Sequence, residues 1–327
     1  MVETPHVIPR FTTPRRVFKG HTSTIQAAAV FPNGHRMVTS SMDLTLLLWD
    51  LKDGSVLKKM EGHKSMVRAV AILHGQLIAS GDEDGALIAW HGDTGEPLTE
   101  AIKIHTTCIR SLDFSPDGTT LASGSWDKTT ELWCTKSWQV LGNPINCGDE
   151  VHCVRYSPSG EFLAIATSDI LIYDSRTREC IATLKTTTSP WAYSLVWVPD
   201  GTRLFSGGTI SDPNIREWDT LTWKQSGDCW SGHTDYIFDI AVNFDGTLIA
   251  SACGDNQVRL WRVSDRRTIA IFKDTQAVLC VTFSMDSKQV LGGGRSMTIK
   301  EWAVPVNVLL EDTPKEQASP RSAIPAL

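Results

Sequence analysis

The sequence predicts an all-β protein built from seven similar units of about 42 residues. Three observations support this prediction. An aromatic residue recurs in phase along the chain, and short β-rich runs separated by turn residues fill each interval. In addition, no long segment keeps the 3.6-residue apolar period of a helix. The count of 12 Trp against 4 Tyr fits such a repeat, because Trp is usually rarer.

The phased aromatic residue ends each unit. Its copies are Trp49, Trp90, Trp133, Tyr173, Trp218, Trp261 and Trp302, at steps of 41, 43, 40, 45, 43 and 41 residues. About 28 residues before this position a histidine recurs in four units, as His21, His63, His105 and His233. In the same four units a hydroxyl residue stands ten residues before the aromatic position, and in most units a polar turn residue stands six residues before it. A period of this size indicates one supersecondary unit per repeat.

Each interval divides into strand-sized runs. In the third unit, residues 109–114 and 120–125 are β-rich and flank Ser115-Pro116-Asp117-Gly118, and residues 128–133 form the next run. Pro, Asp and Gly in that order are typical of a tight turn. Similar turns occur at Phe31-Pro32-Asn33-Gly34, Ser157-Pro158-Ser159-Gly160, Val198-Pro199-Asp200-Gly201 and Asp245-Gly246.

These residues resemble the WD40 family over residues 15 to about 304. The features that carry the resemblance are Gly-His at Gly20-His21 and Gly62-His63, the phased Asp, and Trp-Asp at Trp49-Asp50. The resemblance implies seven four-stranded blades around a central channel. It also implies that an N-terminal strand completes the last blade. We therefore expect residues 15–18 to pair beside the strand at 297–303, so that the ring has no open edge.

The resemblance further implies a structural hydrogen-bond tetrad in four blades, in which a hydroxyl links a buried Trp to a His–Asp pair. The tetrads are His21, Thr39, Asp43, Trp49; His63, Ser80, Asp84, Trp90; His105, Ser123, Asp127, Trp133; and His233, Ser251, Asp255, Trp261. Three units depart from this pattern. The unit of Tyr173 lacks the His and Asp, that of Trp218 has Pro190 and Gly208, and the last has Asp274, Gly292 and Ser296. We expect those three blades to be looser or held by packing alone.

The domain organisation follows from the repeat. We expect an N-terminal extension over residues 1–14, one propeller over 15–304 and a Pro-rich disordered tail over 305–327. Thr313-Pro314 and Ser319-Pro320 in the tail resemble proline-directed phosphorylation sites, whose use the sequence leaves open. The N-terminus shows no secretory signal, no run is long enough to span a membrane, and the eight cysteines show no metal-ligand spacing. A cytoplasmic and/or nuclear protein is expected.

Composition and motifs argue against several kinds of chemistry. The net charge of −6 gives no reason to expect nucleic acid or an anionic membrane as a partner. Ser, His and Asp recur together, but a trio repeated in four units indicates structure rather than a single hydrolytic site. No phosphate-binding loop and no complete calcium loop is present. We expect a protein that is not an enzyme and that binds no cofactor and no metal.

Function is expected at the channel mouth. Positions there follow from the repeat register and from the use of this face in the family. They give the candidate partner-binding residues Arg68, Arg110, Trp126, Trp191, Tyr193, Tyr236 and Phe238. Aromatic and Arg side chains carry most interface energy. The aromatic residues would hold an apolar or cationic side chain of a peptide or loop, and Arg68 and Arg110 an acidic or phosphorylated flank.

The expected function is a non-catalytic scaffold for protein–protein interaction, with other proteins as partners. One alternative is a substrate-recognition subunit of a multiprotein enzyme complex, such as a ubiquitin ligase or a chromatin modifier. A propeller enzyme is a further alternative, which would need convergent polar residues at the mouth. The partner's identity and the oligomeric state are left open.

Overall fold

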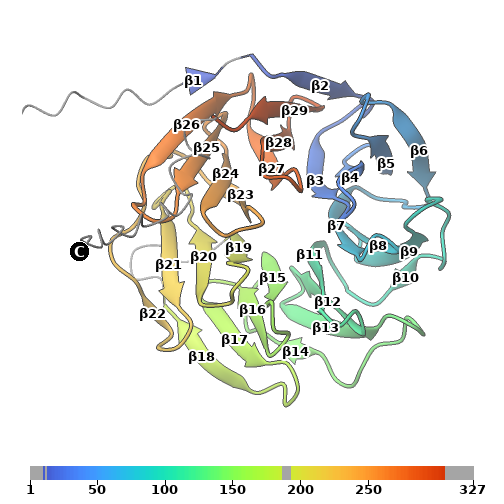
Figure 1. Ribbon diagram of the computed structural model, residues 1–327. Coiled ribbons are helices and arrows are strands. Elements are labelled where there is room, and N and C mark those ends of the chain that lie inside the picture. The colour runs from blue at the N-terminus through green and yellow to red at the C-terminus, as the bar shows by residue number, and fades with distance from the viewer. Residues whose placement is uncertain (1–9, 12, 186–192, 306–327) are drawn as a thin grey trace, which may run out of the picture.

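The computed structural model describes residues 10–11, 13–185 and 193–305, which form a ring of seven β-sheets around a central opening (Figure 1). The described residues contain no helix, and therefore none that could span a membrane. The predicted all-β, seven-bladed architecture is confirmed. The tail over 306–327, with Thr313 and Ser319, lies outside the described residues, as do Pro190 and Trp191.

The first four blades each consist of strands consecutive in the chain. Blade 1 contains β3 (Ile25–Val30), β4 (Arg36–Ser41), β5 (Thr45–Asp50) and β6 (Val56–Glu61). Blade 2 contains β7 (Val67–Leu73), β8 (Leu77–Asp82), β9 (Ala86–His91) and β10 (Ile102–Lys103). Blade 3 contains β11 (Ile109–Phe114), β12 (Thr120–Ser125), β13 (Thr129–Cys134) and β14 (Ile145–Asn146). Blade 4 contains β15 (Cys153–Tyr156), β16 (Phe162–Ala166), β17 (Ile170–Asp174) and β18 (Cys180–Leu184).

The last two blades recruit strands from the N-terminus. Blade 5 again contains four consecutive strands, β19 (Ser194–Trp197), β20 (Arg203–Gly207), β21 (Ile215–Asp219) and β22 (Lys224–Gln225). Blade 6 contains β23 (Ile237–Val242), β24 (Leu248–Cys253), β25 (Gln257–Arg262), β26 (Thr268–Lys273) and β1 (Arg10–Phe11). Blade 7 contains β27 (Val278–Phe283), β28 (Gln289–Gly294), β29 (Thr298–Ala303) and β2 (Arg16–Lys19).

The first strand of each blade lines the channel. The seven innermost strands β3, β7, β11, β15, β19, β23 and β27 contact one another in chain order, and β27 contacts β3 (Figure 1). Apart from the pair β1 and β26, the neighbouring strands within each blade are antiparallel, and side chains alternate between the two faces of the sheet and pack against adjacent blades. The ring is therefore closed.

The N-terminal strand closes the ring as predicted. β2 pairs antiparallel with β29 through four residue pairs, from Arg16 with Glu301 to Lys19 with Thr298. Phe18 of β2 is 1% exposed and packs with its ring edge toward Trp49, so the strand also joins blade 7 to blade 1. The closing strand thus contributes both backbone hydrogen bonds to blade 7 and a buried side chain to the hydrophobic core.

A second N-terminal strand was not predicted. Within the expected extension, β1 pairs parallel with β26 and gives blade 6 a fifth strand. Phe11 lies 5.5 Å from Phe272 between ring centroids, and Phe272 in turn stacks on Trp302. A two-residue parallel pairing leaves no periodic signal in the sequence, so only the fold reveals it.

The phased tryptophans form the core between blades. Trp49, Trp90, Trp133, Trp261 and Trp302 are each 1% exposed. Their packing explains the Gly that precedes His: a Cβ atom at Gly20 would lie 2.8 Å from the Trp49 ring, and one at Gly62 would lie 3.1 Å from Trp90. Glycine at these positions lets the loop approach the indole closely.

Candidate functional site

Three of the four expected tetrads form hydrogen-bond networks made of the expected residues. In blade 3, His105 Nδ1 lies 2.9 Å from Asp127 and its Nε2 lies 2.8 Å from Ser123 Oγ, which also accepts the Trp133 indole N–H at 2.8 Å. Blades 1 and 6 repeat this geometry through His21, Thr39, Asp43 and Trp49 and through His233, Ser251, Asp255 and Trp261.

These networks lie inside the blades and not on a surface. The hydroxyl residues Thr39, Ser80, Ser123 and Ser251 are 0% exposed, and each bonds a Trp and a His at once. Asp43, Asp127 and Asp255 also accept backbone N–H groups of their own turns, which ties each His to a loop. The arrangement holds strands together and gives a substrate no access to the hydroxyl.

Blade 2 corrects the expectation about Asp84. His63 Nδ1 bonds Asp82 at 2.8 Å, two residues earlier, while Ser80 and Trp90 take their expected places. The second oxygen of Asp82 accepts the N–H groups of Asp84 and Ala86, at 3.1 and 2.8 Å. Blades 1 and 3 have a serine at the position of Asp82. Their acid stands two residues later, where it accepts a hydrogen bond from a threonine hydroxyl. In blade 2 the residue at the position of that threonine is Ala86, which has no hydroxyl to donate to Asp84.

The irregular blades 5 and 7 are not held by packing alone, which corrects a second expectation. In blade 5 the Trp218 indole N–H donates to Ser206 Oγ at 2.9 Å. Ser206 lies two residues before Gly208, the position expected for the hydroxyl, because residues 208–214 make a longer turn. Asp212 of that turn pairs with Arg216. In blade 7, Asp274 takes the place of the His and bonds Lys300 and Ser296. Because Gly292 has no hydroxyl, the Trp302 indole N–H has no acceptor in the described part of the chain.

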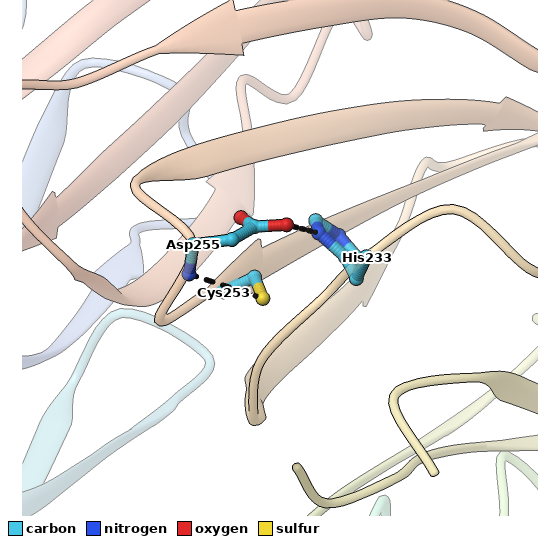
Figure 2. Close-up of side chains that lie close together, drawn as sticks. All are labelled: His233, Cys253 and Asp255. Atoms are coloured by element: carbon cyan, nitrogen blue, oxygen red, sulfur yellow. Dashed lines mark hydrogen bonds and ion pairs between the residues drawn. The ribbon is translucent and has the colours of Figure 1, made fainter.

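Only in blade 6 do the described residues gather three possible metal-ligating side chains: His233, Cys253 and Asp255 (Figure 2). Their donor atoms lie within 4.8 Å of one another, but each is already used. The Cys253 thiol donates to the backbone oxygen of Asp235 at 3.2 Å, as Ser41 and Ser125 do to the equivalent loops of blades 1 and 3. Burial raises the pKa of Cys253 to about 12, which disfavours a metal-binding thiolate.

The channel mouth is built from bulges in the innermost strands. In β3, β7, β11, β23 and β27 the pairing register shifts by one residue near the strand start. The extra residues are Gln26, Arg68, Arg110, Phe238 and Leu279. A bulge turns a side chain out of the sheet's alternation. Together with His152 and Tyr193 these residues surround one cavity of about 80 Å³, called here the channel recess.

An arc of aromatic side chains runs around the mouth across blades 3 to 6. Trp126 lies 6.3 Å from His152, which lies 4.5 Å from Tyr193. Tyr193 meets Tyr236 edge-on at 5.3 Å and Phe238 at 6.1 Å. Three of the expected aromatic residues, Tyr193, Tyr236 and Phe238, therefore cluster. Histidine 152, which joins them to Trp126, was not among the expected partner-binding residues, although it occupies the same register position as Arg110.

Three of these rings form an open pocket above the channel recess. Tyr193, Tyr236 and Phe238 line a cavity of about 320 Å³, called here the aromatic pocket. The rest of its wall comes from the turns of blades 5 to 7, namely Ile210, Asp235, Gly254, Ala277 and Arg295. All three rings are half-buried, and Ile210 is 55% exposed. The pocket thus offers apolar surface with one acidic and one basic residue at its edge.

The two candidate arginines differ in their pairing. The Arg68 guanidinium bonds the Glu83 carboxylate and donates to Gln26 Oε1 at 2.9 Å. Arg110 is half-buried, and no carboxylate of the described residues lies within ion-pair distance of it. Burial, with Arg110 as a further cause, lowers the pKa of His152 to about 4, so this ring is neutral at pH 7. Arg110 is therefore the unneutralised cation of the recess.

Below the mouth, side chains of one blade hold the backbone of the next. Asp113 accepts the N–H of Tyr156 at 2.7 Å, and Asp239 that of Val281 at 3.0 Å. Arg155, which is half-buried, donates to Ser111 Oγ at 3.1 Å. Burial raises the pKa of Asp113 to about 6. These contacts join innermost strands across blade boundaries and hold the mouth residues in place.

The family model described as "WD domain, G-beta repeat" matches residues 12–50, 54–91, 95–134, 178–219 and 224–262, which is more than half of the chain. The chain belongs to the WD40 family. Each matched WD40 range begins in or just before the outer strand of one blade and ends with the third strand of the next. No range covers the repeats that contain Tyr173 and Trp302, two of the three whose tetrad residues depart from the pattern.

Curated WD40 relatives show moderate identity over most of their length. The chain is similar to the small ribosomal subunit protein RACK1 of Neurospora crassa, with 32% identity over 264 residues, covering 64% of this chain and 82% of the relative. It is 28% identical to MST50-interacting protein 11 of Pyricularia oryzae, with the same two coverages. It is 24% identical to the serine-threonine kinase receptor-associated protein of Gallus gallus, covering 78% of this chain and 71% of that one.

Proposed function

We propose that this WD40 propeller is a non-catalytic platform for protein–protein interaction that docks a peptide or loop of a partner at the channel mouth. The observation that carries the proposal is the aromatic pocket of Tyr193, Tyr236 and Phe238. Half-buried aromatic rings around a concave opening are the type of surface on which binding energy concentrates. An apolar or cationic side chain of the partner occupies the pocket.

The arrangement of polar groups supports binding rather than catalysis. The recurrent His, Asp and hydroxyl groups are used inside the blades, and the mouth carries mainly rings and arginines. Two relatives carry names that describe association with other proteins, "MST50-interacting protein 11" and "Serine-threonine kinase receptor-associated protein". A place in the cytoplasm or nucleus is part of the same proposal.

The experiment that tests the proposal is quantitative affinity purification with Tyr193→Ala/Phe238→Ala. We expect partner recovery to fall at least about tenfold, because two hot-spot rings contribute several kcal/mol. The matched control is Phe244→Ala. Phe244 is 75% exposed and follows the other end of the strand that carries Phe238, so it lies on the opposite face of the ring.

Two outcomes decide the proposal. Partner recovery that the double variant leaves unchanged, while its melting transition matches that of the native chain, would remove the mouth as the docking site. Loss of the same partners in Phe244→Ala would place the interface on the opposite face. If ubiquitin-ligase or chromatin-modifier subunits are recovered through the mouth, the protein is a substrate-recognition subunit.

A further inference from the structure

The blade 3 corner of the channel mouth contains two unusual hydrogen-bond donors: Arg110, which lines the channel recess, and Trp126, whose ring lies 6.3 Å from the recess residue His152. The Arg110 guanidinium is half-buried and has no ion-pair partner among the described residues. The Trp126 indole N–H is buried and finds no hydrogen-bond acceptor among the residues that the structure describes. Buried donors are nearly always paired, because an unpaired one loses its water without replacement. The buried Trp126 N–H, close to the unneutralised Arg110, therefore requires an explanation.

Both donors belong to the same corner of the mouth. Ile109 pairs with Ser125 across the sheet, and the backbone N–H of Trp126 donates to the Cys108 carbonyl oxygen at 3.1 Å. Arg110 and Trp126 are therefore the residues that come directly after the paired residues Ile109 and Ser125. The bulge at Arg110 turns its side chain toward the channel recess. His152 links the two, since it contacts the Trp126 ring and Arg110 is one cause of its lowered pKa.

We propose that Arg110 and Trp126 form a receptor for the carboxylate of an Asp or Glu side chain on the docked partner. This inference rests on the proposed function and names the chemistry that the mouth selects. A guanidinium binds a carboxylate through two parallel N–H···O bonds. The indole N–H adds a third donor after a rotation of the ring, since the N–H is covered in the unliganded structure.

Charge and size favour a carboxylate over a phosphate. The recess measures about 80 Å³, which admits the end of one side chain and excludes a nucleotide. Its other arginines have acidic groups near them: Glu83 bonds Arg68, and Asp113 and Asp239 flank Arg155. A single unneutralised cation matches a single negative charge, whereas a phosphate carries about two.

The geometry also favours a protein segment over a free anion. Tyr193 and Phe238 line both the channel recess and the aromatic pocket. A segment that lies across these two rings therefore places one side chain in each cavity. We expect the partner to present an acidic residue close to an apolar or cationic one.

The direct test uses acetate and methyl phosphate as probes of the whole chain by NMR. The ¹H–¹⁵N indole resonance of Trp126, assigned from its loss in Trp126→Phe, should shift on titration with acetate, and methyl phosphate should bind no more tightly. Arg110→Gln should weaken the acetate response at least about tenfold, because a charge-assisted bond is lost. The control Arg176→Gln removes an exposed cation in a turn of blade 4 and should respond as the native chain does.

The second test uses a phage-displayed random peptide library selected on the native chain. Peptides that need Tyr193 and Phe238 should be enriched in Asp or Glu and should lose at least about tenfold in affinity for Arg110→Gln. Peptides that need the two rings but bind Arg110→Gln equally would overturn the carboxylate receptor and leave the docking site intact. Peptides indifferent to both variants would overturn the proposed function. Tighter binding of methyl phosphate than of acetate would overturn the choice of ligand.

Discussion

At the scale of single residues, the hydroxyl of each tetrad connects the core to the loops. Ser123 Oγ accepts the Trp133 N–H and bonds His105, which in turn holds Asp127. In the sequence only the spacing of these residues is visible. In the structure all of these bonds form where water is absent, so the loss of one partner leaves the others without a hydrogen bond.

Substitution of this hydroxyl tests the network. Ser123→Ala leaves the Trp133 N–H and His105 Nε2 without their partner, and we expect the free energy of unfolding to fall by about 1–3 kcal/mol. Ser40→Ala is the matched control, because Ser40 is also 0% exposed but its hydroxyl has no hydrogen-bond partner among the described residues. Urea unfolding followed by Trp fluorescence measures both. Equal losses for the two variants would show that the tetrad contributes no more than an ordinary buried serine.

Buried neutral histidines predict a pH dependence of stability. Burial lowers the pKa of His21, His233 and His152, the last to about 4. Below a pH of about 6.5 the unfolded chain therefore binds protons at these residues that the folded chain does not, and for His152 this difference extends down to a pH of about 4. The free energy of unfolding should therefore fall as the pH falls from 6.5 toward 4, by about 1.4 kcal/mol per pH unit for each full excess proton.

The contribution of His152 to this pH dependence of stability can be measured separately. His152→Phe keeps a ring between Trp126 and Tyr193 but cannot titrate, so the slope of stability against pH should decrease. Tyr193→Phe keeps the titrating histidine and should retain the native slope. Denaturant unfolding at several pH values between 4.5 and 7 gives both slopes. An unchanged slope in His152→Phe would show that this histidine is protonated in the folded state.

At the scale of elements, the closing strand determines whether the ring unfolds as one unit. β2 supplies four residue pairs to β29 and the buried ring of Phe18. A chain that lacks residues 1–19 should show a broad calorimetric transition, with a van't Hoff enthalpy well below the calorimetric enthalpy. A chain that lacks only residues 1–12 loses β1 and keeps β2, and should retain a sharp transition. An equally sharp transition in both would contradict closure by β2.

A structural element could be predicted from the sequence where its residues recur at a fixed spacing in each repeat. Trp, His and turn residues fixed the number of blades and the closing strand, because each blade repeats the same contacts. The acid of blade 2 was misassigned because Asp82 and Asp84 both stand in its turn, and only geometry selects between them. The hydroxyl of blade 5 was missed because a longer turn moved Ser206 out of phase. The ion pairs of blades 5 and 7 replace the His–Asp pattern with different residues at different spacings.

At the scale of the whole molecule, the ring brings together residues that are distant in the chain. The channel recess takes residues from all seven blades, from Gln26 to Leu279. Register alone located these positions, and the bulges explain why, since each re-aims the same residue of the innermost strand. Register could not tell that Arg68 is neutralised by Glu83 while Arg110 is not, because that difference depends on side-chain geometry. Trp191 lies outside the described residues and stays a prediction.

The central claim is that the mouth, and not another face of the ring, holds the partner. Hydrogen–deuterium exchange of the native chain, measured with and without a partner recovered by affinity purification, tests it most directly. We expect slower exchange at residues 109–110, 193–196 and 236–238, and unchanged exchange at the turns of the opposite face near residues 158–160 and 244–246. Protection confined to those turns, with the mouth residues exchanging as in the free protein, would contradict the account.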